Sequence, residues 1–83
     1  MLKSFLFDKA KYLAADENGQ EILLVVDYKN NTYKLVGKGS PELRTELGII
    51  AADLLKRKHH VNFANHVGVY LIYETLQHDV TKG

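Results

Sequence analysis

The stretch from Ser40 to His60 constrains the fold most, because its sequence predicts one long amphipathic helix. Ser40 is a favourable N-cap residue, and Pro41 suits the first helical position because its missing N–H would have no partner there. Apolar residues then recur at intervals of three and four positions, which places them on one side of a helix. They are Leu43, Leu47, Ile50, Ala51, Leu54 and Leu55. We therefore expect a helix over residues 40–60 with one face in a core and the other in water.

The charged residues at the two ends of this stretch would interact favourably with the helix dipole. Glu42 and Glu46 bring negative charge to the positive amino end, whereas Lys56, Arg57 and Lys58 bring positive charge to the carbonyl end. The same basic cluster could contact phosphate groups. The sequence thus leaves two roles open for Lys56, Arg57 and Lys58, namely a solvated helix end and an anion-binding site.

Two short apolar segments before the helix predict a β-hairpin. The segment from Glu21 to Tyr28 is rich in β-branched residues and too short for a typical helix, which favours a buried strand. Lys29, Asn30 and Asn31 favour a turn, because Asn tolerates left-handed backbone angles. Residues 32–36 then return as a second, antiparallel strand.

Two further segments fit more than one element. In residues 2–16 the large apolar side chains suit one face of an N-terminal helix, whereas Phe5 and Phe7 alternate as they would in a strand. We leave both interpretations open. In residues 67–76 the alternation of Val, Leu, Tyr and Thr on one face favours a strand, although a spacing of three and four also fits a helix.

Together these segments predict a single α+β domain over residues 1–83, in which a small antiparallel sheet covers the apolar stripe of the main helix. With 83 residues the core is close to the lower limit for independent stability, so association with another chain would help it. A hydrophobic fraction of 46% and a charged fraction of 25% argue against disorder. The net charge of +1 gives no reason to expect nucleic acid as a partner.

The first seven residues, MLKSFLF, are apolar but are soon followed by Asp8, Lys9 and Lys11. A signal peptide or a membrane span would need a longer uninterrupted apolar region. The chain has no cysteine, so it offers no disulfide and no thiolate ligand. We therefore expect a soluble, cytoplasmic protein that does not contact a membrane.

Histidine is concentrated after the main helix, at His59, His60, His66 and His78. A metal site needs several side chains that converge on one point, but neighbouring residues on a helix point about 100° apart. Because no H-x-x-x-H spacing is present either, we expect no metal and no other cofactor. Acid–base catalysis by a histidine cluster and simple capping of helix carbonyls remain as alternatives.

The order of these histidines resembles that of the pterin-4a-carbinolamine dehydratase family. The resemblance consists of a helix that ends in His59 and His60, a connection, an apolar strand and a His-Asp pair that begins at His78. In that family the three histidines line a pterin pocket. The resemblance therefore implies acid–base roles for His59, His60 and His78 toward a pterin-like small molecule. It also implies ligand contacts for Phe63 and Asn65, which stand near the family's aromatic and Asn positions.

The chain departs from the family pattern at several positions. Val61 and Asn62 stand where the family has Pro and an acidic residue, and Gln77 replaces a Thr. Such changes imply a scaffold used for protein binding, as in dehydratase-like assembly factors for Rubisco. Our first hypothesis is thus a dehydratase-like module that binds a protein partner or itself, as a homo-oligomer, through the edge-prone strand at residues 67–76. An active pterin dehydratase is the first alternative, and phosphate or nucleic-acid binding at the basic helix end is the second.

Overall fold

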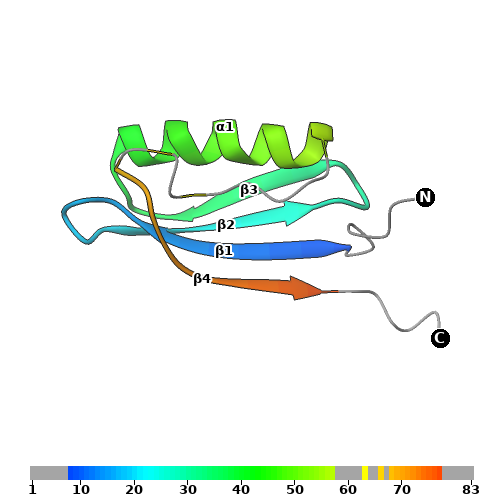
Figure 1. Ribbon diagram of the computed structural model, residues 1–83, viewed down its shortest axis with the longest axis horizontal. Helices are drawn as coiled ribbons and strands as arrows, with labels where there is room; N and C mark the ends of the chain where they lie inside the picture. Colours follow the sequence, from blue (N-terminus) through cyan, green and yellow to red (C-terminus); the bar gives the residue numbers. More distant parts are fainter. Residues whose placement is uncertain (1–7, 58–62, 64–65, 67, 78–83) are drawn as a thin grey trace.

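The computed structural model describes residues 8–57, 63, 66 and 68–77. Four strands form one antiparallel sheet in the order β3-β2-β1-β4, and one helix lies along one face of this sheet (Figure 1). In chain order the elements are β1 (Lys9–Ala15), β2 (Glu21–Asp27), β3 (Thr32–Gly37), α1 (Pro41–Arg57) and β4 (Tyr70–Gln77). The predicted α+β architecture is confirmed.

Strand β1 decides between the two interpretations of the amino-terminal segment. Residues 9–15 form a strand, whereas residues 1–7 lie outside the described part of the chain. Up to residue 14 the buried side chains of β1 are Ala10, Tyr12 and Ala14, which alternate with more exposed neighbours, and Ala15 at the end of the strand is buried as well. This alternation has the two-residue period of a strand with one covered face. The alternation was hard to recognise in the sequence because three of the four buried residues are alanines.

The β2–β3 hairpin forms at the predicted turn. Asn31 has a φ of 59°, in the left-handed region that Asn tolerates. The carboxylate of Asp27 accepts hydrogen bonds from the backbone N–H of Asn30, at 3.0 Å, and from its side-chain amide, at 2.8 Å. These bonds hold the pKa of Asp27 below its usual range. The turn is therefore fixed by local hydrogen bonds as well as by backbone preference.

Helix α1 supplies five of the fourteen residues in the buried core cluster. Its first turn is capped by the hydroxyl of Ser40, which accepts a hydrogen bond from the backbone N–H of Leu43 at 3.1 Å. The buried stripe of the helix packs against β2 and β3, and it consists of Leu43, Leu47, Ile50, Ala51 and Leu54. On the sheet, Ile22, Leu24 and Val26 have no exposed surface. Burial of each such aliphatic side chain contributes about 1.5–3 kcal/mol.

The connection from α1 to β4 completes the core on the β1 side. Phe63 is buried, and its ring lies 5.3 Å from the ring of Tyr12, centroid to centroid. A turn then follows, in which the backbone N–H of Val69 donates to the carbonyl of His66 and Gly68 has a φ of 83°. This turn directs the chain into β4. No helix in the described ranges is long and apolar enough to cross a membrane.

Candidate functional site

Of the residues that the family resemblance singles out, His59, His60, Asn65 and His78 lie outside the described residues. Lys58, from the predicted basic cluster, lies outside them as well. Convergence of the three histidines on one pocket therefore stays a prediction. Among the residues that the structure does describe, no group of three or more His, Asp or Glu side chains is arranged to hold a metal ion.

The remaining predicted residues have definite positions. Phe63 is only 4% exposed and packs on Tyr12 as part of the core. Lys56 and Arg57 are exposed in the last turn of α1. The guanidinium Nε of Arg57 lies 2.9 Å from a carboxylate oxygen of Asp53, which is one helical turn earlier. Arg57 thus already has an anionic partner, and Lys56 is its exposed neighbour.

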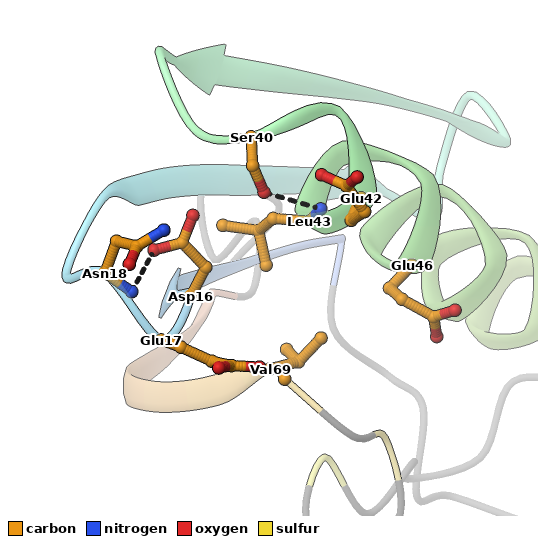
Figure 2. A pocket seen from close by; sticks show the side chains of 9 residues that line it. Asp16, Glu17, Asn18, Ser40, Glu42, Leu43, Glu46 and Val69 are labelled. Atoms are coloured by element: carbon orange, nitrogen blue, oxygen red, sulfur yellow. Dashed lines mark hydrogen bonds between the residues drawn. The ribbon is translucent and has the colours of Figure 1, made fainter.

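A hollow of about 370 Å³ lies at the amino end of α1 (Figure 2). The β1–β2 turn, the first two turns of α1 and the two residues just before β4 surround it. Four of its lining side chains are acidic, namely Asp16, Glu17, Glu42 and Glu46. At the edge of this region, Nδ1 of His66 lies 3.1 Å from the Glu46 carboxylate, which joins the connection to the helix.

Asp16 is the buried member of this acidic hollow. Its Oδ1 atom accepts hydrogen bonds from the backbone N–H groups of Asn18, at 2.9 Å, and Gln20, at 3.0 Å. Burial raises the pKa of Asp16, but hydrogen bonds from Gln20 and Asn18, with Ser40 acting in the same direction, outweigh burial and leave the pKa below its usual value. Asp16 therefore stays ionised at neutral pH and fixes the β1–β2 turn.

Two tyrosines, Tyr12 and Tyr28, are buried in the hydrophobic core. The hydroxyl oxygens of Tyr12 and Tyr28 are 3.3 Å apart and share a hydrogen bond. Burial raises the pKa of Tyr12, and the hydrogen bond with Tyr28 and the charge of Glu74 raise it further. Burial also raises the pKa of Tyr28. Both phenols are neutral at physiological pH, so this pair stabilises the core and does not supply a reactive anion.

The strongest surface feature is strand β4 at the edge of the sheet. Every side chain from residue 70 to residue 76 is exposed, and five of them are large and apolar. These five are Tyr70 at 57% exposure, Leu71 at 37%, Ile72 at 49%, Tyr73 at 49% and Leu76 at 41%. We call the segment Tyr70–Leu76 the β4 edge. It is uncovered because α1 packs on β2 and β3, two and three strands away (Figure 1).

The sheet surface opposite α1 forms the second large exposed feature. We call it the open face, and its side chains come from the alternate positions that do not point to the core: Lys9, Lys11, Leu13, Glu21, Leu23, Val25, Asp27, Thr32, Lys34, Val36, Tyr73 and Thr75. A hollow of about 500 Å³ lies on this face between β1, β2 and β3. No described element covers it.

We compared the chain with protein-family models, with curated proteins and with solved structures, and found no match in any of the three. The functional argument therefore rests on the two uncovered surfaces. The sequence predicted a strand over residues 67–76, and the structure has it at Tyr70–Gln77, after a turn that includes Gly68. Its tendency to pair at an edge stays a prediction. The sequence did not indicate that both sides of this strand are exposed, because that depends on which strands the helix covers.

Proposed function

We propose that this chain is a protein-association module in which β4 pairs with a strand of another chain, and that the first such partner is a second copy of itself. One observation carries the proposal: the β4 edge is exposed on both sides as well as along its outer backbone. An unpaired edge strand offers N–H and C=O groups to another strand. Apolar side chains on both sides would add buried area to those hydrogen bonds.

The two edges of the sheet differ in a way that favours β4. Strand β3, at the opposite edge, carries Lys34, and Lys38 follows its end. Lysines on an edge discourage pairing because a partner strand would have to bury their charge. The β4 edge has a single charged residue, Glu74, and no proline. Pairing at β4 therefore buries more apolar surface and less charge.

A symmetric antiparallel pair can also avoid a clash at Glu74. If the two-fold axis passes through Tyr73, Glu74 stands opposite Ile72 of the partner copy, and the two Glu74 carboxylates do not face each other. The result is a continuous eight-stranded sheet. Like charges directly opposite in a sheet are destabilising, so this register is preferred to one centred on Glu74.

The dehydratase-like scaffold and its pterin chemistry stay predictions from the family resemblance. Both depend on His59, His60 and His78, which lie outside the described residues. Strand pairing rests on described residues instead, so it is the function that we test first.

Sedimentation equilibrium of two matched variants tests the pairing. Ile72→Glu places a carboxylate directly opposite Glu74 of the partner copy, whereas Ile49→Glu places the same charge on the outer surface of α1, where Ile49 is 53% exposed. Like charges directly opposite in a sheet are destabilising, so Ile72→Glu will weaken pairing through β4 by at least about tenfold and Ile49→Glu will not. On association, amide hydrogen exchange in residues 70–77 will also slow. A monomer at high micromolar concentration, or equal effects of the two variants, would refute the proposal.

A further inference from the structure

We propose that the open face is a second self-association surface, on which another copy of this chain packs face to face to form a two-sheet sandwich. This surface lies on the side of the sheet away from α1 and is separate from the outer backbone of β4. The inference does not require strand pairing at β4. It rests on a row of apolar side chains, on the charges beside that row and on the symmetry that a second copy imposes.

The apolar row crosses all four strands. Val36 pairs with Leu23, Leu23 with Leu13, and Leu13 with Tyr73, so the four side chains stand side by side on one face. Val36 is 50% exposed and Tyr73 is 49% exposed, and the two leucines between them are half-buried. An apolar row of this kind is the part of a sheet face that normally packs against another layer.

The two sides of this row differ in the sign of their net charge, because Lys9, Lys11 and Lys34 outnumber Asp27 on one side and Glu21 lies on the other. On one side, Lys34 and Lys11 both pair with Val25, so one lysine stands on each side of that valine. On the other side, Glu21 pairs with Ala15. In the described part of the chain, Lys11, Lys34 and Glu21 make no hydrogen bond or ion pair through their side chains. These charges are therefore available to a partner.

The two-fold symmetry of a homodimer brings these charges together. In a face-to-face pair whose two-fold axis runs along the apolar row, the strands of the second copy are reversed, so its Glu21 side lies over the lysine side of the first copy. Glu21 is on β2, as is Val25. The carboxylate of Glu21 in one copy then lies above Val25 of the other, between Lys11 and Lys34. Val25, Lys11 and Lys34 are among the residues that line the hollow on the open face.

The alternative symmetric arrangement is unfavourable. A two-fold axis parallel to the strands would place the lysine side of one copy over the lysine side of the other, because positions along the strands would be preserved. Like charges that face each other across an interface disfavour association. Charge therefore selects one packing, with the two sheets about 10 Å apart and their strands about 30° from alignment.

The size of the face predicts a reversible dimer. Four strands spaced about 4.8 Å apart and seven residues long cover about 19 Å by 23 Å. This flat area is about half of the roughly 800 Å² per partner that a standard interface buries. We therefore expect a dimer that dissociates on dilution and that salt weakens, because its specificity comes from exposed charge pairs.

Variants in which the charges of Glu21, Lys11 and Lys34 are reversed test the face-to-face arrangement directly. Glu21→Lys will place three cations together in the dimer, and the double variant Lys11→Glu, Lys34→Glu will place three anions together. Each will weaken face-to-face association by at least about tenfold. The triple variant that combines all three changes restores opposite charges and will recover it. Lys56→Glu, on the exposed last turn of α1, is the control and will leave association unchanged.

Sedimentation equilibrium over a range of concentrations separates the outcomes. Loss in both charge-reversed proteins with recovery in the triple variant supports the sandwich. Unchanged association in Glu21→Lys refutes it, and so does loss without recovery, because Glu21 would then not lie between the lysines. Circular dichroism confirms that each variant folds, and all of the changed residues are on the surface or half-buried at a strand face.

Each of the two proposed interfaces can be disrupted without loss of the other. If both exist, their axes are perpendicular and both pass through Tyr73, so four copies form a closed assembly. Glu21→Lys would then leave a dimer joined at β4, Ile72→Glu would leave a dimer joined at the open face, and the combination would leave a monomer. If only the open face associates, Ile72→Glu has no effect and Glu21→Lys gives a monomer.

Discussion

Gly37 lies so close to Glu21 that a Cβ atom at position 37 would be 2.7 Å from the backbone carbonyl oxygen of Glu21. The φ angle of Gly37 is 133°, which side chains other than hydrogen rarely permit. Gly37 is the last residue of β3, and its carbonyl accepts a hydrogen bond from the guanidinium of Arg44 on α1. The hydrogen bond between Gly37 and Arg44 thus joins the end of the β2–β3 hairpin to α1.

Substitution of Gly37 tests this close contact. Gly37→Ala will lower the free energy of unfolding by about 2–3 kcal/mol, because it adds both an unfavourable φ and a collision with a backbone oxygen that cannot move freely. Gly19→Ala is the matched control. Gly19 has a φ of 81° but no heavy atom within 4 Å of a built Cβ, so it carries only the backbone cost of about 1 kcal/mol. Urea denaturation of both variants gives the difference, and equal losses would contradict the proposed contact.

The buried pair of tyrosines predicts a loss of stability at alkaline pH. Their raised pKa values mean that Tyr12 and Tyr28 keep their protons when folded, whereas an unfolded tyrosine loses its proton near pH 10. Stability from this source is therefore complete below about pH 10 and declines as pH rises further. Tyr12→Phe removes one of the two groups, so it will flatten the decline by up to about 1.4 kcal/mol per pH unit.

The same variant has a second expected effect at neutral pH. Loss of the Tyr12 hydroxyl removes its hydrogen bond to Tyr28, which will cost about 1 kcal/mol. The difference in stability between wild type and Tyr12→Phe should accordingly be constant from about pH 7 to pH 9 and shrink above pH 10. Denaturant titrations at a series of pH values measure it. A difference that stays constant into the alkaline range would exclude the proposed titration.

The lowered pKa of Asp16 predicts a loss of stability at acidic pH. Its pKa is below the ordinary value of 3.8 when folded, so the ionised carboxylate stabilises the folded state above that pH. This stability is lost as pH falls from 3.8 through the lower folded pKa. Asp16→Asn keeps an oxygen acceptor for Asn18 and Gln20 but has no charge to titrate. The wild type should therefore be the more stable protein at neutral pH, and its advantage should shrink below about pH 4.

Thermal unfolding followed at about pH 3 and at about pH 7 measures that advantage. Other carboxylates are present in both proteins, so their titration cancels in the difference. If the advantage of wild type over Asp16→Asn is the same at both pH values, Asp16 does not carry the proposed stabilisation.

The helix and the hairpin could be predicted because their signals are local. Ser40, Pro41 and a regular apolar stripe specify α1, and the structure places its boundaries at Pro41 and Arg57 within the predicted range. Strand β1 was ambiguous for a physical reason. Its buried positions include Ala10 and Ala14, whose small side chains contribute little to a hydrophobic pattern although the close packing of the sheet requires them there.

The candidate surfaces depended on information that no single segment contains. The row of Val36, Leu23, Leu13 and Tyr73 comes from four strands and becomes visible only when their registers are known. The exposure of β4 depends on the position of α1 over other strands. The family resemblance directed attention to the histidines, three of which lie outside the described residues, whereas the described surfaces are apolar.

The pairing of β1 with β4 also has a consequence for synthesis of the chain. The ribosome releases β1 first and β4 last among the four strands, yet the two are hydrogen-bonded neighbours in the sheet. Until β4 has left the exit tunnel, one edge of β1 has no strand to pair with. A β1–β2–β3 meander with α1 can form earlier, but the unpaired β1 edge can associate with other chains until β4 is available. Crowded polysomes would therefore favour encounters between the β1 edge of one nascent chain and the β4 segment of another.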